Sequence, residues 1–111
     1  MTKEEKKIQR IKQQILDLGP VLPGRISQQY NVCGKASCQC KDPKHPVKHG
    51  PYYHLSFSIG GKTSSMFLKE EQLVEAQRWI RNHQKLKDLV NQLVQAHVDL
   101  ARSGALAGDK R

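Results

Sequence analysis

Residues 52–68 read YYHLSFSIGGKTSSMFL, and their pattern predicts a β-hairpin. Two strand-like runs flank Gly60-Gly61, which supplies a two-residue turn because glycine tolerates positive φ. Since side chains alternate between the two faces of a strand, a turn there sets one register for the whole hairpin. The mostly apolar face holds Tyr53–Leu68, Leu55–Met66, Phe57–Ser64 and Ile59–Lys62, and the opposite face holds His54–Phe67, Ser56–Ser65 and Ser58–Thr63. We expect Tyr53 and Phe57 to lie in the core.

The residues before the hairpin predict a third strand and a helix. Residues 25–32, RISQQYNV, alternate as a half-buried strand does. Residues 3–18 carry one apolar stripe at spacings of three and four, formed by Ile8, Ile11, Ile15 and Leu18, which indicates a helix. Gly19-Pro20 ends that helix, and residues 19–24 form a linker.

The residues after the hairpin, 69–102, predict one long helix. Its seam alternates steps of four and three: Trp79, His83, Leu86, Val90, Leu93, His97 and Leu100. A helix of this length spans about 50 Å, so the N-terminal helix covers only part of it. The seam therefore predicts a homodimer or a helical protein partner, and Trp79 is expected to pack on the sheet.

Together these elements predict an α+β fold: a small antiparallel three-stranded sheet with a zinc loop, a short N-terminal helix and a long C-terminal coiled-coil-like helix. The expected organisation is an N-terminal helix and linker at 1–24, a zinc-binding β domain at 25–68, the long amphipathic helix at 69–102 and a disordered tail at 103–111.

Charge is concentrated in the middle of the chain. The 111 residues carry a net charge of +9, and residues 25–68 contain six Lys or Arg against Asp42 alone. A basic block favours polyanion partners, nucleic acid first. No apolar run approaches the roughly 20 residues needed to cross a bilayer, and the charged N-terminus does not look like a signal peptide. We therefore expect a cytoplasmic protein without a membrane partner.

Three cysteines lie within eight residues, at positions 33, 38 and 40. Clustered cysteines in a reducing compartment indicate metal or redox chemistry. Cys33, Cys38 and Cys40 offer three thiolates, and His49 or His45 completes the four ligands of a structural Zn²⁺ site. An iron–sulfur cluster usually requires a fourth cysteine. We expect zinc, with His49 ranked above His45 because His45 lies in a lysine-rich, flexible stretch.

The segment Cys33-Gly34-Lys35-x-x-Cys38-x-Cys40, followed by His49-Gly50-Pro51-Tyr52-Tyr53, a Gly61-Lys62 hairpin turn and a long helix containing Trp79, resembles a small uncharacterised prokaryotic family. Its members share this cysteine cluster and the HGPYY segment. The resemblance favours His49 over His45 as the fourth ligand and implies nothing about activity.

The predicted function is nucleic-acid binding, with DNA favoured. Lysine side chains of the zinc loop would contact phosphates, and the polar face of the first strand carries residue types that read base edges. The candidate nucleic-acid-binding residues are Arg25, Gln29, Asn31, Lys35, Lys41, Lys44, Lys48, Tyr52 and Lys62. Two alternatives remain open: a zinc adaptor whose long helix docks a larger protein, and a thiol redox or metal sensor. We do not expect an enzyme, because residues 25–68 provide no carboxylate pair for acid–base catalysis.

Overall fold

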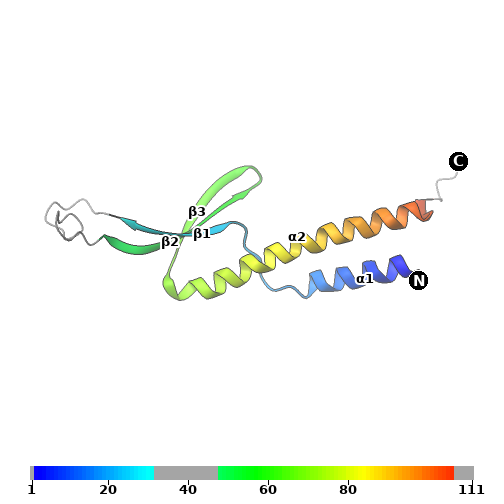
Figure 1. Ribbon diagram of the computed structural model, residues 1–111, viewed down its shortest axis with the longest axis horizontal. Coiled ribbons are helices and arrows are strands. Elements are labelled where there is room, and N and C mark those ends of the chain that lie inside the picture. Colours follow the sequence, from blue (N-terminus) through cyan, green and yellow to red (C-terminus); the bar gives the residue numbers. More distant parts are fainter. Residues whose placement is uncertain (1, 32–47, 107–111) are drawn as a thin grey trace. The chain divides into compact units, whose positions relative to one another are not determined.

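The computed structural model describes residues 2–31 and 48–106. The elements follow in the order α1 (Lys3–Leu16), β1 (Arg25–Asn31), β2 (His49–Ile59), β3 (Lys62–Leu68), one 3₁₀ turn, η2 (Glu70–Gln72), and α2 (Leu73–Arg102) (Figure 1). This arrangement confirms the predicted α+β class. The chain divides into two compact units, Leu22–Ile80 and the pair Met1–Val21 with Arg81–Arg111. Each unit has its own apolar cluster.

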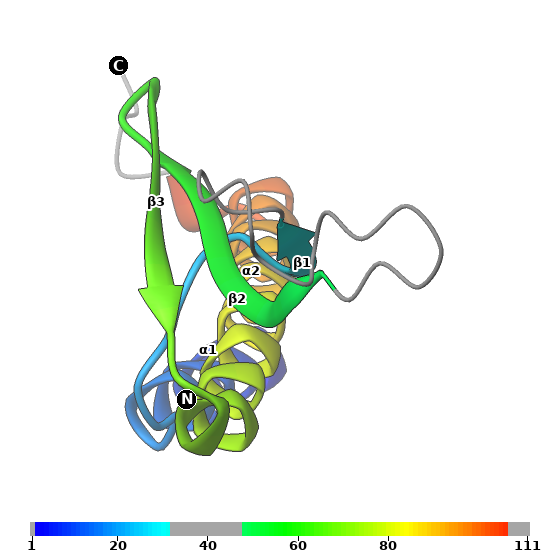
Figure 2. The same cartoon turned by 90° about the vertical axis from the view of Figure 1, so that its left-hand side faces the viewer.

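The sheet occupies the unit Leu22–Ile80, with β2 between β1 and β3 and every neighbour antiparallel (Figure 2). All seven predicted hairpin pairs, from Tyr53–Leu68 to Ile59–Lys62, are confirmed. The turn holds Gly60 at φ 59° and Gly61 at φ 84°, the left-handed conformations that a two-residue hairpin loop needs. β2 begins at His49, three residues earlier than the sequence pattern indicated.

One face of this sheet forms the core of its unit. Leu55, Leu68 and Ala76 are buried, so the first turns of α2 pack on the face that Leu55 shares with Leu68. Partly buried apolar side chains complete this cluster: Leu22, Ile26, Tyr53, Phe57, Leu73 and Ile80. The expected core positions of Tyr53 and Phe57 are therefore confirmed. Trp79 is half-buried and lines a cavity of about 310 Å³ together with Met66 and Leu68, but it is not one of the side chains of this cluster, so its packing on the sheet stays a prediction.

Gly24 lets the chain enter β1 close to β2. Its φ is +97°, a conformation that other residues rarely adopt. A Cβ at this position would overlap the backbone oxygen of Ser56 and lie 2.9 Å from Cβ of Phe57. Glycine is thus required for the tight approach that starts the sheet.

The other unit is a helix pair. α1 begins with a capping box, in which the Glu5 amide donates to Thr2 Oγ1 (3.1 Å) and the Thr2 amide donates to Glu5 Oε1 (2.8 Å). The hydrogen bond from the Thr2 amide, with a smaller contribution from the Thr2 side chain, lowers the pKa of the Glu5 carboxyl. The charged carboxylate therefore supports the cap at neutral pH, and this support is lost as the pH falls through the lowered pKa.

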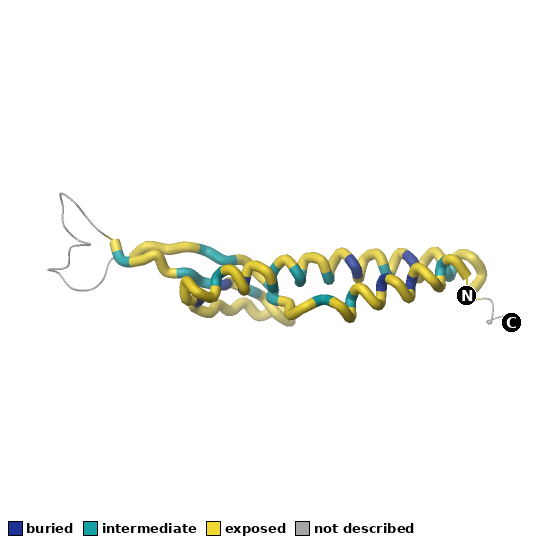
Figure 3. The backbone as a smooth tube through the Cα atoms, turned by 90° about the horizontal axis from the view of Figure 1, so that it is seen from below, coloured by how far each residue is buried: buried dark blue, intermediate teal, exposed yellow. Residues whose placement is uncertain are grey.

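Ile8 and Ile11 of α1 bury themselves against Leu89 and Ala96 of α2, as the facing dark segments in Figure 3 show. Ile15, Leu18, Leu93 and Leu100 are partly buried around them. The apolar stripe predicted for the N-terminal helix is confirmed, although α1 ends at Leu16 and Leu18 lies just beyond it.

α1 packs on a stripe of α2 that differs from the predicted seam. Leu93 and Leu100 pack against α1, but Val90 and His97 are exposed. The buried positions are instead Leu89 and Ala96, one residue earlier in each heptad. Both stripes follow the same steps of four and three, and α1 packs on the one that includes Ala96, whose small side chain allows two helix backbones to approach.

Candidate nucleic-acid interface and metal site

The second face of the sheet is polar and open. Strand alternation and the register place ten side chains on it, here called the open face: Arg25, Ser27, Gln29, Tyr52, His54, Ser56, Ser58, Thr63, Ser65 and Phe67. None of the ten is buried, and only Ser27 and His54 are partly covered. Ser58 and Thr63 hydrogen-bond to each other through their hydroxyls (2.9 Å) across the hairpin. The open face therefore presents hydroxyl, amide, guanidinium and aromatic groups to solvent.

Aromatic side chains form a distinct part of the open face. Register aligns Ser27, His54 and Phe67 in one row across the three strands, with Gln29 and Tyr52 in the next row. The rings of His54 and Phe67 lie 4.4 Å apart between centroids and are tilted by 41°. Phe67 is 68% exposed and Tyr52 is 38% exposed.

Phe67 is a candidate contact that the sequence prediction omitted. The predicted register already placed it opposite the apolar face, paired with His54. That pairing was the signal that marked it as a surface residue, whereas its hydrophobic character suggested the core.

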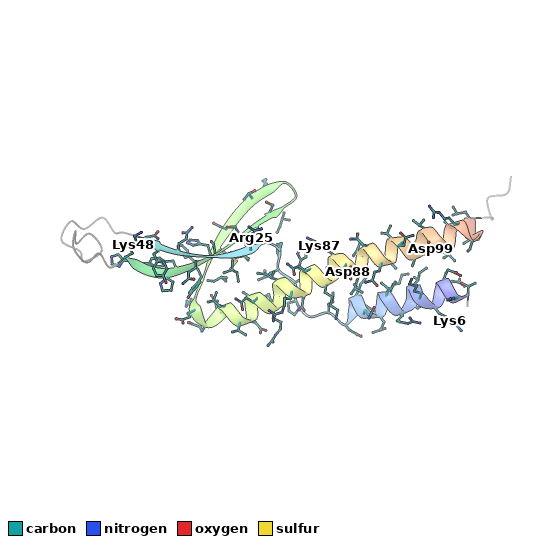
Figure 4. All side chains as sticks on the ribbon, in the orientation of Figure 1. Lys6, Arg25, Lys48, Lys87, Asp88 and Asp99 are labelled. Carbon is teal, nitrogen blue, oxygen red and sulfur yellow. The ribbon has the colours of Figure 1, made fainter. Side chains whose placement is uncertain are left out.

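The sheet is electropositive. β1, β2 and β3 together contain no aspartate or glutamate, while Arg25 and Lys62 lie within them. Arg25 and the exposed Lys48 lie near opposite ends of the β1–β2 pair (Figure 4). Six residues of strand separate these ends, which corresponds to about 20 Å. An anionic chain can therefore meet a cation at each end of β1 without facing a carboxylate of the sheet.

The structure gathers some of the predicted contacts and separates others. Arg25, Gln29 and Tyr52 share the open face. Lys62 pairs with Ile59 and therefore belongs to the other face, so its grouping with them is not supported by the register. Asn31 is exposed and pairs with His49 at the end of β1. Lys35, Lys41 and Lys44 lie outside the described residues.

The predicted metal site is only partly within the described chain. Cys33, Cys38, Cys40 and the alternative ligand His45 fall outside it, and His49 is the half-buried first residue of β2. Within residues 2–31 and 48–106, no three His, Cys, Asp or Glu side chains gather as a metal site would require. The described chain thus contributes one of the four predicted ligands.

The backbone next to His49 lies tightly against β1. Gly50 has a φ of +137°, and a Cβ there would lie 2.8 Å from the Gln29 carbonyl oxygen and 3.0 Å from Cδ1 of Tyr30. The Gly50–Pro51 peptide bond is cis. Only glycine allows this approach, so His49 is attached to a backbone segment whose position against β1 is fixed.

Comparison with known proteins identifies a family for this chain but no activity. None of the helices in the described chain is long and apolar enough to cross a membrane. Neither a curated protein nor a solved structure matches the sequence. A family model does match, over residues 1–78, a range that contains α1, the sheet and every predicted metal and nucleic-acid contact. The chain therefore belongs to the family described as Domain of unknown function (DUF6788).

Proposed function

We propose that this protein is a small zinc-binding module that binds nucleic acid, with DNA favoured. The observation that supports it best is the open face: an exposed, polar sheet surface without carboxylates, on a protein with a net charge of +9. Nucleic acid offers phosphates for the cations and base edges for the amide and guanidinium groups. Arg25 and Gln29 are the residue types that bond guanine and adenine most specifically.

The metal would organise the basic segment between β1 and β2. Asn31 and His49 pair in the register, so the segment that connects them leaves and re-enters the sheet at one end. Cys33 follows Asn31 by two residues, and Lys35, Lys41, Lys44 and Lys48 belong to the same stretch. Three thiolates and one imidazole are a donor set that structural zinc prefers. Zinc held by Cys33, Cys38, Cys40 and His49 would tie these lysines to the edge of the open face.

Salt dependence tests the phosphate contacts. We expect the affinity for a DNA oligonucleotide to fall steeply with salt, because each neutralised phosphate releases counterions. Replacing Lys35, Lys41, Lys44 and Lys48 together with glutamine should reduce the slope of log K against log salt by about three to four units. Fluorescence anisotropy at several salt concentrations measures that slope.

The matched control replaces Lys3, Lys6, Lys7 and Lys12 of α1 with glutamine. These side chains are all exposed, and the change in net charge is the same. This control variant should retain most of the slope of log K against log salt. Absent binding, salt-independent binding or equal losses in the two variants would contradict the proposal.

One observation favours a second function, that of an adaptor or dimer. Val90, Val94 and Val98 are exposed at spacings of four along α2, and such a stripe suits a helical partner or a second copy. In that case Val94→Lys should abolish the dimer or a stoichiometric protein partner, since it places a charge in the contact. Val74→Lys, at another exposed valine of α2, should not.

Light scattering measures the dimer, and affinity purification after nuclease treatment detects a stoichiometric protein partner. A monomer without a stoichiometric partner, or equal effects of the two substitutions, would exclude this function.

A further inference from the structure

We propose that the open face binds single-stranded rather than duplex nucleic acid, by stacking unpaired bases on Phe67 and Tyr52. This inference rests on the proposed nucleic-acid binding and specifies the substrate. It starts from the aromatic side chains of the open face, whose exposure the hydrophobic core does not explain.

Phe67 does not belong to the apolar cluster of its unit. It lies on the face opposite to Leu55 and Leu68, two residues from the exposed Ser65 on its own strand, and 68% of its surface is accessible. The ring of Phe67 contacts the ring of His54, and this contact restrains the Phe67 ring on one side. A single exposed apolar side chain is common on protein surfaces. Here, however, two aromatic residues and a histidine occupy adjacent rows of one face.

The spacing of the rows suits successive bases. Tyr52 and His54 are two residues apart on β2, which places their rows about 7 Å apart. RNA- and DNA-binding sheets use aromatic residues at such positions to stack two or three unpaired bases. In a duplex the base faces are already stacked on their neighbours and cannot reach a side chain. Aromatic stacking on a sheet therefore selects single strands.

Charge and hydrogen-bonding groups around the rings are complementary to a polynucleotide. Arg25 lies in the row beside His54 and Phe67, with Ser56 and Ser65 across from it. The strands carry no carboxylate that would repel phosphates. Hydroxyl and amide groups can bond to sugar, phosphate or base edges without strict sequence demands. The open face thus combines a stacking surface with a cation, the two components of general single-strand binding.

The test compares 12-nucleotide single strands, oligo(dT) and oligo(U), with a 12-base-pair duplex by fluorescence anisotropy on the full chain. The single strands should bind more tightly than the duplex. Phe67→Ala and Tyr52→Ala should each weaken single-strand binding about 5- to 150-fold, the range found when a stacked aromatic is replaced by alanine. Phe67→Tyr should retain the wild-type affinity for single strands, because tyrosine keeps the aromatic ring.

Ile59→Ala is the control for a merely apolar surface contact. Ile59 is 64% exposed on the same hairpin but on the other face, so its loss should leave affinity unchanged. Equal or tighter duplex binding, or unchanged affinity in both alanine variants while binding stays salt-dependent, would overturn the inference and leave the proposed function standing. Absence of binding to every probe would overturn both.

Discussion

Leu55→Ala should remove most of the stability of the unit Leu22–Ile80. Leu55 is 0% exposed at the centre of β2, where it pairs with Ile26 on one side and Met66 on the other. It also packs with Leu68 and Ala76, so its loss leaves a cavity in the apolar cluster on which the sheet depends. Such a truncation costs about 2–5 kcal/mol. Small domains have total stabilities of only about 5–15 kcal/mol.

Urea unfolding monitored by Trp79 fluorescence measures this effect, since Trp79 lies in the same unit and lines a cavity with Met66 and Leu68. The matched control is Ile59→Ala, which removes a side chain of the same size from an exposed position of the same strand. This control should lower the free energy of unfolding by less than about 1 kcal/mol, which is the full range of the β-propensity scale. Equal unfolding midpoints for the two variants would mean that Leu55 is not the centre of this core.

The hairpin could be predicted pair by pair because its register has few degrees of freedom. Gly60-Gly61 permits a two-residue turn, and once the turn is placed every later pair follows from the alternation of side chains. The same alternation correctly placed Arg25 and Gln29 on one face. Local backbone chemistry was sufficient here, since no distant contact had to be known.

The helix seam could not be predicted in the same way. α2 carries two adjacent stripes with the same spacing, one containing Leu89 and Ala96 and the other, the predicted seam, containing Val90 and His97. Which stripe is buried depends on how closely α1 approaches, a tertiary property that periodicity does not contain. Phe67 is a different case, because the register of the hairpin already placed it opposite the apolar face and only its hydrophobic character suggested the core.

Replacing a zinc ligand should strongly reduce both the zinc affinity and the nucleic-acid affinity of the protein. We expect one zinc ion per chain by native mass spectrometry of protein purified without chelator. Cys38→Ser should lower zinc affinity by more than about 100-fold, since loss of a group that only hydrogen-bonds to a metal ligand already lowers affinity about 10- to 100-fold. The nucleic-acid affinity should fall with it, because the lysines between β1 and β2 lose the metal that holds their segment together.

Two histidine variants distinguish the fourth ligand, and the helix pair supplies an internal control. His49→Ala should release the metal and His45→Ala should retain it; the reverse result would make His45 the ligand. Helical circular dichroism should persist in every variant, because the cluster of Ile8, Ile11, Leu89 and Ala96 contains none of the proposed ligands. If the wild-type protein carries no zinc, or if Cys38→Ser binds it as tightly as the wild type, the lysines between β1 and β2 are not organised by a metal, and nucleic-acid binding would depend on the open face alone.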